Sequence, residues 1–349
     1  MQPIFDGHND VLYRLHTQAA AGHDPIAEFL SGTSEGHIDG PRARKGGLAG
    51  GLCAIYLSSP DLRHRELDAR GHYEIPLPVP LAHEPSLARA MEIAAIAQRL
   101  DRAGAWKICR SVKDIRAAMD AGIFAAVLHM EGCEAINASL DELETFYASG
   151  LRSLGPVWSR ETIFGHGVPF AYPRDPDIGP GLTEAGFRLV EACNSFGIIL
   201  DLAHLNEKGF WDVARTSKHP LVASHSNVHA LTPVARNLTD RQMDAIRDSK
   251  GIAGLNFAVT MLREDGLEDA NTPMETLVRH IDYMVERMGI DCVGLGSDYD
   301  GATIPADIAD AAGSQVLVEA LSKAGYGEED LAKLCRENWL RVAAETWGQ

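Results

Sequence analysis

The chain has 349 residues, which is enough for one large α/β barrel domain or for two domains of ordinary size. Its formal net charge of -17 argues against a nucleic-acid-binding protein, because neutralising phosphates requires a surplus of Lys and Arg, and against adhesion to anionic membranes. The hydrophobic share of 45% is that of a globular protein able to form a full core.

The six cysteines are scattered through the chain and include no CxxC pair. In a chain of this size, that pattern predicts small buried side chains rather than a disulfide framework. We find neither a secretory signal nor an apolar run of about 18 residues, the length that would indicate a membrane span. The sequence therefore predicts a cytoplasmic protein whose partner is a small molecule, with no nucleic acid and no membrane bound.

Apolar runs typical of buried strands alternate with amphipathic segments, which predicts βαβ units and a parallel sheet. The predicted strands are 3–10, 48–57, 125–131, 151–158, 198–204, 221–225, 251–257 and 293–298. The predicted helices are 86–103, 112–121, 140–148, 183–196, 208–216, 240–249 and 273–288, with two more between 315 and 347. Thr183 and Asp240 are the expected N-caps of their helices. Eight strands with intervening helices favour a closed (β/α)8 TIM barrel, with 1–349 as a single domain, over an open sheet.

Three stretches depart from this alternation, namely 16–44, 61–85 and 160–180. They are polar and rich in Gly, Pro and His. Long connections of this kind are usually lids or mobile insertions, so we expect loops inserted into the barrel. The first and third of them are expected to shape substrate specificity.

Five of the predicted strands end on metal-seeking or proton-transferring side chains. In chain order these residues are His8 and Asp10, Glu131, His204, His225 and Asp298. Active-site residues of a parallel barrel come from the ends of different strands at one face. The pattern therefore predicts a single metal site at the C-terminal ends of the strands.

His8 and Asp10 are two residues apart on the first strand, so both side chains lie on the same face and can reach one ion. An imidazole with a carboxylate suits zinc or a similar divalent metal. The alternative is a His–Asp hydrogen bond at a strand end. Glu131 has two carboxylate oxygens and is the candidate bridge between two metals. A surface carboxylate after a strand is its alternative.

Two neighbours compete with Glu131. His129 would point along the same face, but its deeper place in the strand favours a core histidine or one that supports a ligand. Glu134 lies past the strand, in a predicted turn or helix start. Neither neighbour displaces Glu131 as the preferred bridge.

His204 and His225 end consecutive strands, where adjacent barrel strands bring side chains close together, and they are the candidate ligands of the second metal. Their alternative role is as hydrogen-bonded core histidines. Asp201 lies three residues before His204 and could support the ligands. His229 is expected in a turn beyond the site.

Asp298 ends the last strand and is the candidate general base and acid, accepting a proton from water and passing it to the leaving amine. Asp300, two residues on, is its rival. Arg236 follows His225 by eleven residues and is well placed to bind an anionic substrate group in bidentate fashion. An ion pair between Arg236 and Asp240 that orders the loop is the alternative.

Six segments together resemble the membrane (renal-type) dipeptidase family of zinc peptidases, within the amidohydrolase superfamily. They are Asp6-Gly7-His8-Asn9-Asp10, His129-Met130-Glu131-Gly132, Leu200-Asp201-Leu202-Ala203-His204, Ser224-His225-Ser226-Asn227, Arg236-Asn237-Leu238-Thr239-Asp240 and Gly296-Ser297-Asp298-Tyr299-Asp300-Gly301. The resemblance extends from residue 4 to about residue 347. The set is specific in its order and spacing, although each segment alone is not.

The resemblance implies a (β/α)8 barrel with two divalent ions, expected to be Zn²⁺. His8 and Asp10 would bind one ion, His204 and His225 the other, and Glu131 would bridge them. By the same resemblance Asp298 would transfer the proton, Arg236 would hold the C-terminal carboxylate of a dipeptide, and a homodimer is expected. The predicted reaction is hydrolysis of the dipeptide amide bond by a hydroxide that bridges the two zinc ions.

The chain departs from the family at the end of the fourth strand, where members usually carry a histidine thought to contact the scissile carbonyl. Trp158 stands at that place and is a candidate substrate-binding residue. An indole donates one hydrogen bond and carries no charge. Either His166 in the following loop takes over the catalytic contact, or zinc and Arg160 stabilise the oxyanion; His166 is preferred. The lipid anchor of animal members is not expected here.

Two other kinds of function stay open from the sequence. An N-acyl amino-acid deacylase or a β-lactam hydrolase could use the same ligands, because these do not reveal the acyl group. A catalytically silent homologue that binds metal or ligand is the non-enzyme alternative. The complete ligand set argues against it, since a binding module does not need an open metal centre with a proton-transfer carboxylate.

Overall fold

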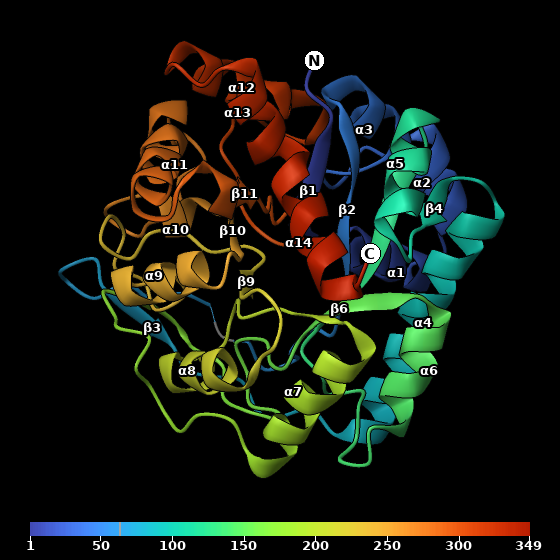
Figure 1. Cartoon of the computed structure of the whole chain (residues 1–349), viewed down its shortest axis with the longest axis horizontal. Helices are drawn as coiled ribbons and strands as arrows, with labels where there is room; N and C mark the ends of the chain where they lie inside the picture. Colours follow the sequence, from blue (N-terminus) through green and yellow to red (C-terminus); the bar gives the residue numbers. More distant parts are fainter. Residues whose placement is uncertain (63) are drawn as a thin grey trace.

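A ring of parallel strands with helices on its outside forms the body of the protein in the computed structural model, which describes residues 1–62 and 64–349 (Figure 1). The strands of the ring are β1(Ile4–Asn9), β2(Leu48–Tyr56), β5(Phe124–Glu131), β6(Leu151–Gly155), β8(Ile199–Leu200), β9(Val222–Ala223), β10(Ile252–Leu255) and β11(Val293–Leu295). Each corresponds to one of the predicted strands, so the α/β barrel expected from the alternating pattern is confirmed.

Regular strand pairing runs in two arcs rather than around the whole ring. One arc has the order β1-β2-β5-β6-β8 and the other has the order β11-β10-β9. Single parallel bridges join the arcs, Asp201 to Val222 at one seam and Asn9 to Tyr299 at the other. Regular strand pairing therefore closes the barrel only in part. The two seams lie beside the ends of β1, β8 and β11, close to candidate site residues that follow these strands.

The helices cover the outside of the ring and close one of its ends (Figure 1). They are α1(Val11–Ala20), α2(Pro25–Ser31), α3(Gly40–Gly46), α4(His83–Arg102), α5(Val112–Asp120), α6(Asp141–Ser149), α7(Glu184–Phe196), α8(Glu207–Thr216), α9(Asp240–Asp248), α10(Val259–Leu262), α11(Met274–Met288), α12(Gln315–Lys323), α13(Glu328–Ala332) and α14(Asn338–Trp347), with the short 3₁₀ helices η1(Ile290–Cys292) and η2(Ala311–Gly313) and the π-helix η3(Lys333–Glu337). The second predicted C-terminal helix consists of α13, η3 and α14 in direct succession.

One of the two predicted helix caps is at the expected residue. Thr183 caps α7, its side chain accepting a hydrogen bond from the backbone of Gly186. The cap of α9 is Thr239 and not Asp240, because Thr239 and Gln242 form a reciprocal capping box. Asp240 occupies the first turn of that helix instead, where its charge favours the helix dipole.

The stretch 16–44 is largely helical, which corrects the expectation of a long loop. It contains the end of α1 and the short helices α2 and α3. Asp24 caps α2 and Asp39 caps α3 through side-chain hydrogen bonds, and each helix has a proline in its first turn. The Gly and Pro that suggested a loop instead stand at the ends of these short helices, with Pro in the first turn of each and Gly32 and Gly47 at their C-caps.

The other two insertions meet each other outside the barrel. β3(Tyr73–Ile75) and β7(Phe170–Tyr172) pair as a two-stranded antiparallel sheet. The rest of 61–85 and 160–180 is mostly irregular, as expected; residue 63 of the first stretch lies outside the described residues. A third short strand, β4(Trp106–Ile108), pairs with the first residues of β5.

The described cysteines are all free and buried, as the sequence predicted. Among the described residues, no helix combines the length and the hydrophobicity that crossing a membrane requires.

Helix α14 lies across the ring of strands (Figure 1) and inserts Trp339 among them. The indole nitrogen of Trp339 donates a hydrogen bond to the carbonyl of Leu295 at 2.9 Å. A Cβ atom at Gly7 would lie 2.2 Å from the Trp339 ring, and one at Gly294 would lie 2.6 Å from it. Glycines in these strands therefore make the space that the indole fills.

Replacing this tryptophan should destabilise the protein strongly. Trp339→Ala is expected to lower the free energy of unfolding by about 3–5 kcal/mol, because it leaves a large buried cavity. Denaturant unfolding measures the change, and Trp211→Ala, at a half-buried indole on α8, is the matched control. A loss for Trp339→Ala no greater than the control's would contradict the packing role.

Candidate metal centre

The five predicted metal ligands come together at one end of the barrel. His8 and Asp10 lie at the end of β1, Glu131 is the last residue of β5, and His204 and His225 follow β8 and β9. All five side chains are buried. Nε2 of His8 lies 3.4 Å from a carboxylate oxygen of Asp10 and 3.6 Å from Oε1 of Glu131.

Glu131 lies between two groups of candidate ligands. Its Oε1 is 3.1 Å from Nε2 of His204 and 3.6 Å from Nε2 of His225. His8, Asp10 and Glu131 offer one set of ligand atoms within 4.8 Å of one another, and Glu131, His204 and His225 offer a second. A carboxylate shared by two such sets is the arrangement that two bridged cations require.

Several buried polar atoms of these residues have no hydrogen-bond partner among the described residues, including both ring nitrogens of His8 and Oδ1 of Asp10. An unpartnered buried polar group costs about 1–3 kcal/mol, and coordination to a cation would remove that cost. Imidazole nitrogens with carboxylate oxygens form the donor set of zinc and related divalent metals. The residues present therefore fit a metal centre.

The charges of the site also favour a cation. Burial lowers the pKa of His204 and of His225 well below the ordinary range, which keeps both imidazoles in the neutral form that binds metals. Burial also disfavours the charged form of His8, but the neighbouring Glu131 and Asp10 outweigh it and raise its pKa to about 10.

Two serines orient the histidines of the second group. Oγ of Ser159 lies 2.8 Å from Nδ1 of His204, and Oγ of Ser224 lies 2.7 Å from Nδ1 of His225. Hydrogen bonds at Nδ1 leave Nε2 available for a metal. The sequence reasoning did not single out either serine, although Ser224 directly precedes a candidate ligand and so could have been considered.

A cavity of about 700 Å³ opens over these residues and is lined by Asp10, Glu131, His204, Arg236 and Asp298, among others. His204 and Asp298 have positive φ angles of 69° and 58°, which non-glycine residues rarely adopt. Strained backbone of this kind is found most often at functional sites, where the surrounding structure holds it.

Asp298 is held at the cavity by the side chain of Asn256, whose amide donates to Oδ2 at 3.0 Å. Burial raises the pKa of Asp298. Its rival Asp300 also lines the cavity, but Oδ2 accepts from Nε of Arg14 at 3.2 Å and Oδ1 accepts from the backbone of His37 at 2.5 Å. Asn256 was missed, although it lies near the end of a predicted strand for which no site residue was proposed.

Arg236 is buried and forms no ion pair with a carboxylate within 4 Å among the described residues. Its guanidinium makes long contacts with the Ser226 hydroxyl at 3.5 Å and the His225 carbonyl at 3.3 Å. The alternative pairing with Asp240 does not form, because Asp240 is bound by Arg287 at 3.0 Å. Burial lowers the pKa of Arg236 to about 10. A buried cation of this kind is suited to binding an anion from the cavity.

Trp158 also lines the cavity, beside the aromatic rings of Tyr56 and Phe170 at centroid distances of 5.2 and 5.5 Å. Among the described residues, no hydrogen-bond acceptor pairs with its indole N–H, whereas Trp106, Trp211, Trp339 and Trp347 each donate to one. Trp158 therefore contributes to an aromatic wall of the cavity.

Arg160 is absent from the described residues that line the cavity, so its expected contact with the substrate stays a prediction that this arrangement does not support. Its side chain is fully buried, and Nε donates to Oε1 of Glu134 at 2.8 Å while Nη2 donates to the carbonyl of Leu57 at 3.0 Å. These bonds join the loop after β6 to the end of β2. They also engage Oε1 of Glu134, which is not part of any group of candidate ligands among the described residues.

His166 is likewise absent from the described residues that line the cavity. Its Nδ1 lies 2.8 Å from a carboxylate oxygen of Glu161, and its carbonyl accepts from the backbone of Asn206. The loop is further fixed by a bond from Val168 to the carbonyl of His204. The structure therefore gives no support to the expected contact between His166 and the scissile carbonyl, which stays a prediction.

The remaining histidines and acids fall where the sequence favoured them. His129 is fully buried, with Nδ1 2.9 Å from the Ser153 hydroxyl, as a core histidine would be. His229 bonds to the carbonyl of Arg174, away from the cavity lining. Asp201 lies beside the ligands and is considered further below.

Comparison with known proteins agrees with this geometry. The family model for the membrane dipeptidases, peptidase family M19, matches residues 1–347. A metallo peptidase from Rhodobacter sphaeroides, solved with a phosphinate mimic of the dipeptide L-Ala-D-Ala, is 50% identical over 99% of both chains, with a TM-score of 0.94. The dipeptidase AC is also 50% identical, over 100% of this chain and 99% of its own, with a TM-score of 0.94.

A more distant relative is the dipeptidase tcpJ of Claviceps purpurea, which is 25% identical over 97% of this chain and 76% of its own. The partly closed barrel, with histidines and carboxylates gathered at its strand ends, defines a metal-dependent hydrolase. The chain belongs to peptidase family M19, the membrane dipeptidase family, and is a metallo-dipeptidase.

Proposed function

We propose that this enzyme hydrolyses dipeptides with a free C-terminal carboxylate at a centre of two divalent cations, with zinc the ion that the donor set favours. His8 and Asp10 would hold one cation, His204 and His225 the other, and Glu131 both. The observation that carries the proposal is that Glu131 is shared by two ligand groups and lines the same cavity as Arg236, whose guanidinium has no carboxylate partner within 4 Å among the described residues. The relative that was solved with a dipeptide mimic supports it.

Different side chains of the cavity perform different steps of the proposed reaction. Bound cations would polarise the scissile carbonyl and lower the pKa of water toward neutrality. Asp298 accepts the proton of the attacking water and delivers it to the nitrogen of the breaking C–N bond, so that the amine leaves neutral. Arg236 binds the C-terminal carboxylate, and Trp158 with Tyr56 supplies a wall against which the substrate packs.

A substrate panel with zinc-loaded enzyme tests the proposal. We expect turnover of L-Ala-L-Ala or L-Ala-D-Ala with kcat/KM at least roughly 30-fold above that of the corresponding dipeptide amides, because the amide loses a charge-assisted contact worth about 2 kcal/mol or more. N-acetyl-L-alanine and a β-lactam are the matched competitors. Chelation of the metal should abolish the activity, and added zinc should restore it.

Each failure of this experiment has a distinct meaning. Preferred hydrolysis of the N-acyl amino acid would indicate a deacylase, and preferred hydrolysis of the β-lactam would indicate a lactam hydrolase. Binding of zinc without turnover of any substrate would indicate a silent homologue. Turnover that survives complete removal of metal would contradict the metal-dependent mechanism.

A further inference from the structure

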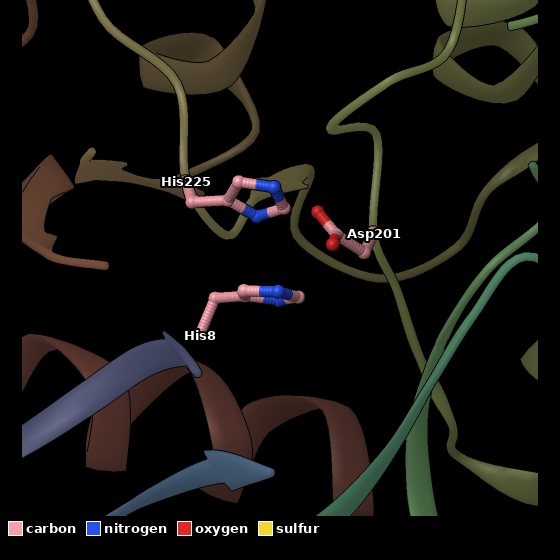
Figure 2. A group of neighbouring side chains, drawn as sticks. All are labelled: His8, Asp201 and His225. Atoms are coloured by element: carbon pink, nitrogen blue, oxygen red, sulfur yellow. The ribbon is translucent and has the colours of Figure 1, made fainter. Parts of the chain in front are cut away.

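Asp201 is a buried carboxylate beside the candidate ligands that the proposed reaction does not use. It directly follows β8 and forms one of the two bridges that join the arcs of the barrel. Figure 2 shows its carboxylate facing the imidazole rings of His8 and His225. Those rings stack on each other with centroids 3.9 Å apart, and the three residues offer ligand atoms within 4.8 Å of one another.

The hydrogen bonds of Asp201 fix the proton on one of these ligands. Oδ2 accepts the hydroxyl proton of Ser224 at 2.5 Å, and the same hydroxyl oxygen lies 2.7 Å from Nδ1 of His225. A hydroxyl has a single proton, and a carboxylate can only accept. Because that proton goes to Asp201, the oxygen of Ser224 must accept from Nδ1–H of His225, which leaves the lone pair of His225 on Nε2.

We infer that Asp201 is a positioning residue of the metal centre, acting on His225 through Ser224 and adding a buried negative charge beside His8. The inference rests on the proposed two-cation site. Partners of this kind orient a metal-binding histidine and raise its basicity. The carboxylate is held in place in turn, because Oδ1 accepts from the backbone of Ser224 at 2.8 Å and of Ala203 at 3.1 Å.

The same three residues could instead be considered as ligands of a further cation. Asp201 is poorly suited to that role, because it already accepts three hydrogen bonds within 3.1 Å. Nδ1 of His225 is also occupied, by Ser224. A cation at this place would have to break these bonds, whereas Nε2 of His225 faces the other candidate ligands, 3.1 Å from Nε2 of His204 and 3.6 Å from Oε1 of Glu131.

Zinc titration of the full chain tests the inference without relying on activity. Competition with a chromophoric chelator gives the zinc affinity, and thermal unfolding with and without zinc gives the stabilisation by the metal. Asp201→Asn and Ser224→Ala should each weaken the binding of at least one zinc ion by about 10- to 100-fold. The double variant should be no worse than Asp201→Asn, since both residues act through one chain of hydrogen bonds.

The matched control is Thr232→Val, which removes a buried hydroxyl 3.5 Å from Nε2 of His280, a histidine outside the candidate ligand groups. Its zinc affinity should equal that of the wild type. If the Asp201→Asn variant does not fold, Ser224→Ala by itself still tests the inference.

Two results would overturn the positioning role. One is unchanged zinc affinity with equal losses of thermal stability in the metal-free and the loaded protein, which is the sign of a purely structural residue. The other is loss of a whole zinc equivalent in Asp201→Asn with none of the effect in Ser224→Ala, which is the sign of a direct ligand. If the wild type itself binds no zinc, the proposed metal centre fails, and that outcome differs from both.

Discussion

Asp298→Asn should lower kcat by about 10²- to 10⁴-fold, the range by which a positioned general acid and base accelerates a reaction. The amide keeps the size of the side chain but can neither accept the proton of water nor return it to the leaving amine. Zinc should still bind, because the side chains assigned to the cations are His8, Asp10, Glu131, His204 and His225. Steady-state kinetics with a dipeptide, together with metal analysis of the same sample, checks both parts.

Asp300→Asn is the matched control for this experiment. Asp300 lines the same cavity two residues further on, but its carboxylate is bound by Arg14 and by the backbone of His37. Its loss of kcat should be much smaller than that of Asp298→Asn. The proton-transfer assignment is wrong if the two variants behave alike, or if Asp298→Asn retains full kcat with its metal bound.

Arg236→Met should lower kcat/KM for dipeptides by about 30- to 3,000-fold, which corresponds to the roughly 2–5 kcal/mol cost of truncating one partner of a buried charge pair. The loss should depend on the substrate carboxylate, so kcat/KM for the dipeptide amides should fall only a little. Kinetics with each dipeptide and its amide, in wild type and variant, gives this difference directly.

The stability of the same variant provides an independent check. Arg236 lacks a carboxylate partner within 4 Å among the described residues, so replacing it by a methionine of similar length should not destabilise the protein. Thermal unfolding of the metal-free protein measures this. Equal losses of kcat/KM for dipeptides and their amides, with a marked fall in stability, would mean that Arg236 shapes the site rather than binding the carboxylate.

The sequence by itself determined the strands of the barrel and the candidate ligands at their ends. Each strand is a short apolar run, and burial on both faces makes such runs recognisable without any tertiary information. The two-residue spacing of His8 and Asp10 places them on one face of β1, because the side-chain period of a strand is two. Glu131, His204 and His225 follow from the same rule, since the ends of parallel strands converge at one face.

The loops were less predictable, because their direction depends on contacts between residues distant in sequence. Trp158, Arg160 and His166 lie within nine positions of one another and all looked able to reach the substrate. Only Trp158 of the three lines the cavity. The ion pair with Glu134 holds Arg160 in the interior, and Nδ1 of His166 contacts the carboxylate of Glu161 rather than the cavity.

Tertiary structure alone decided how the barrel closes and how its centre is supported. His204 and Asp298 lie within a few residues of the two bridged seams, and no local pattern signals a positive φ at a histidine or an aspartate. The bond from Asp201 to Ser224 joins two different strands, so it exists only once β8 and β9 are adjacent. The local sequence determines which residues lie at the strand ends, because the alternation of side chains along a strand is a local property. The residues that hydrogen-bond to them come from distant parts of the chain, so only the packing of the barrel determines which they are.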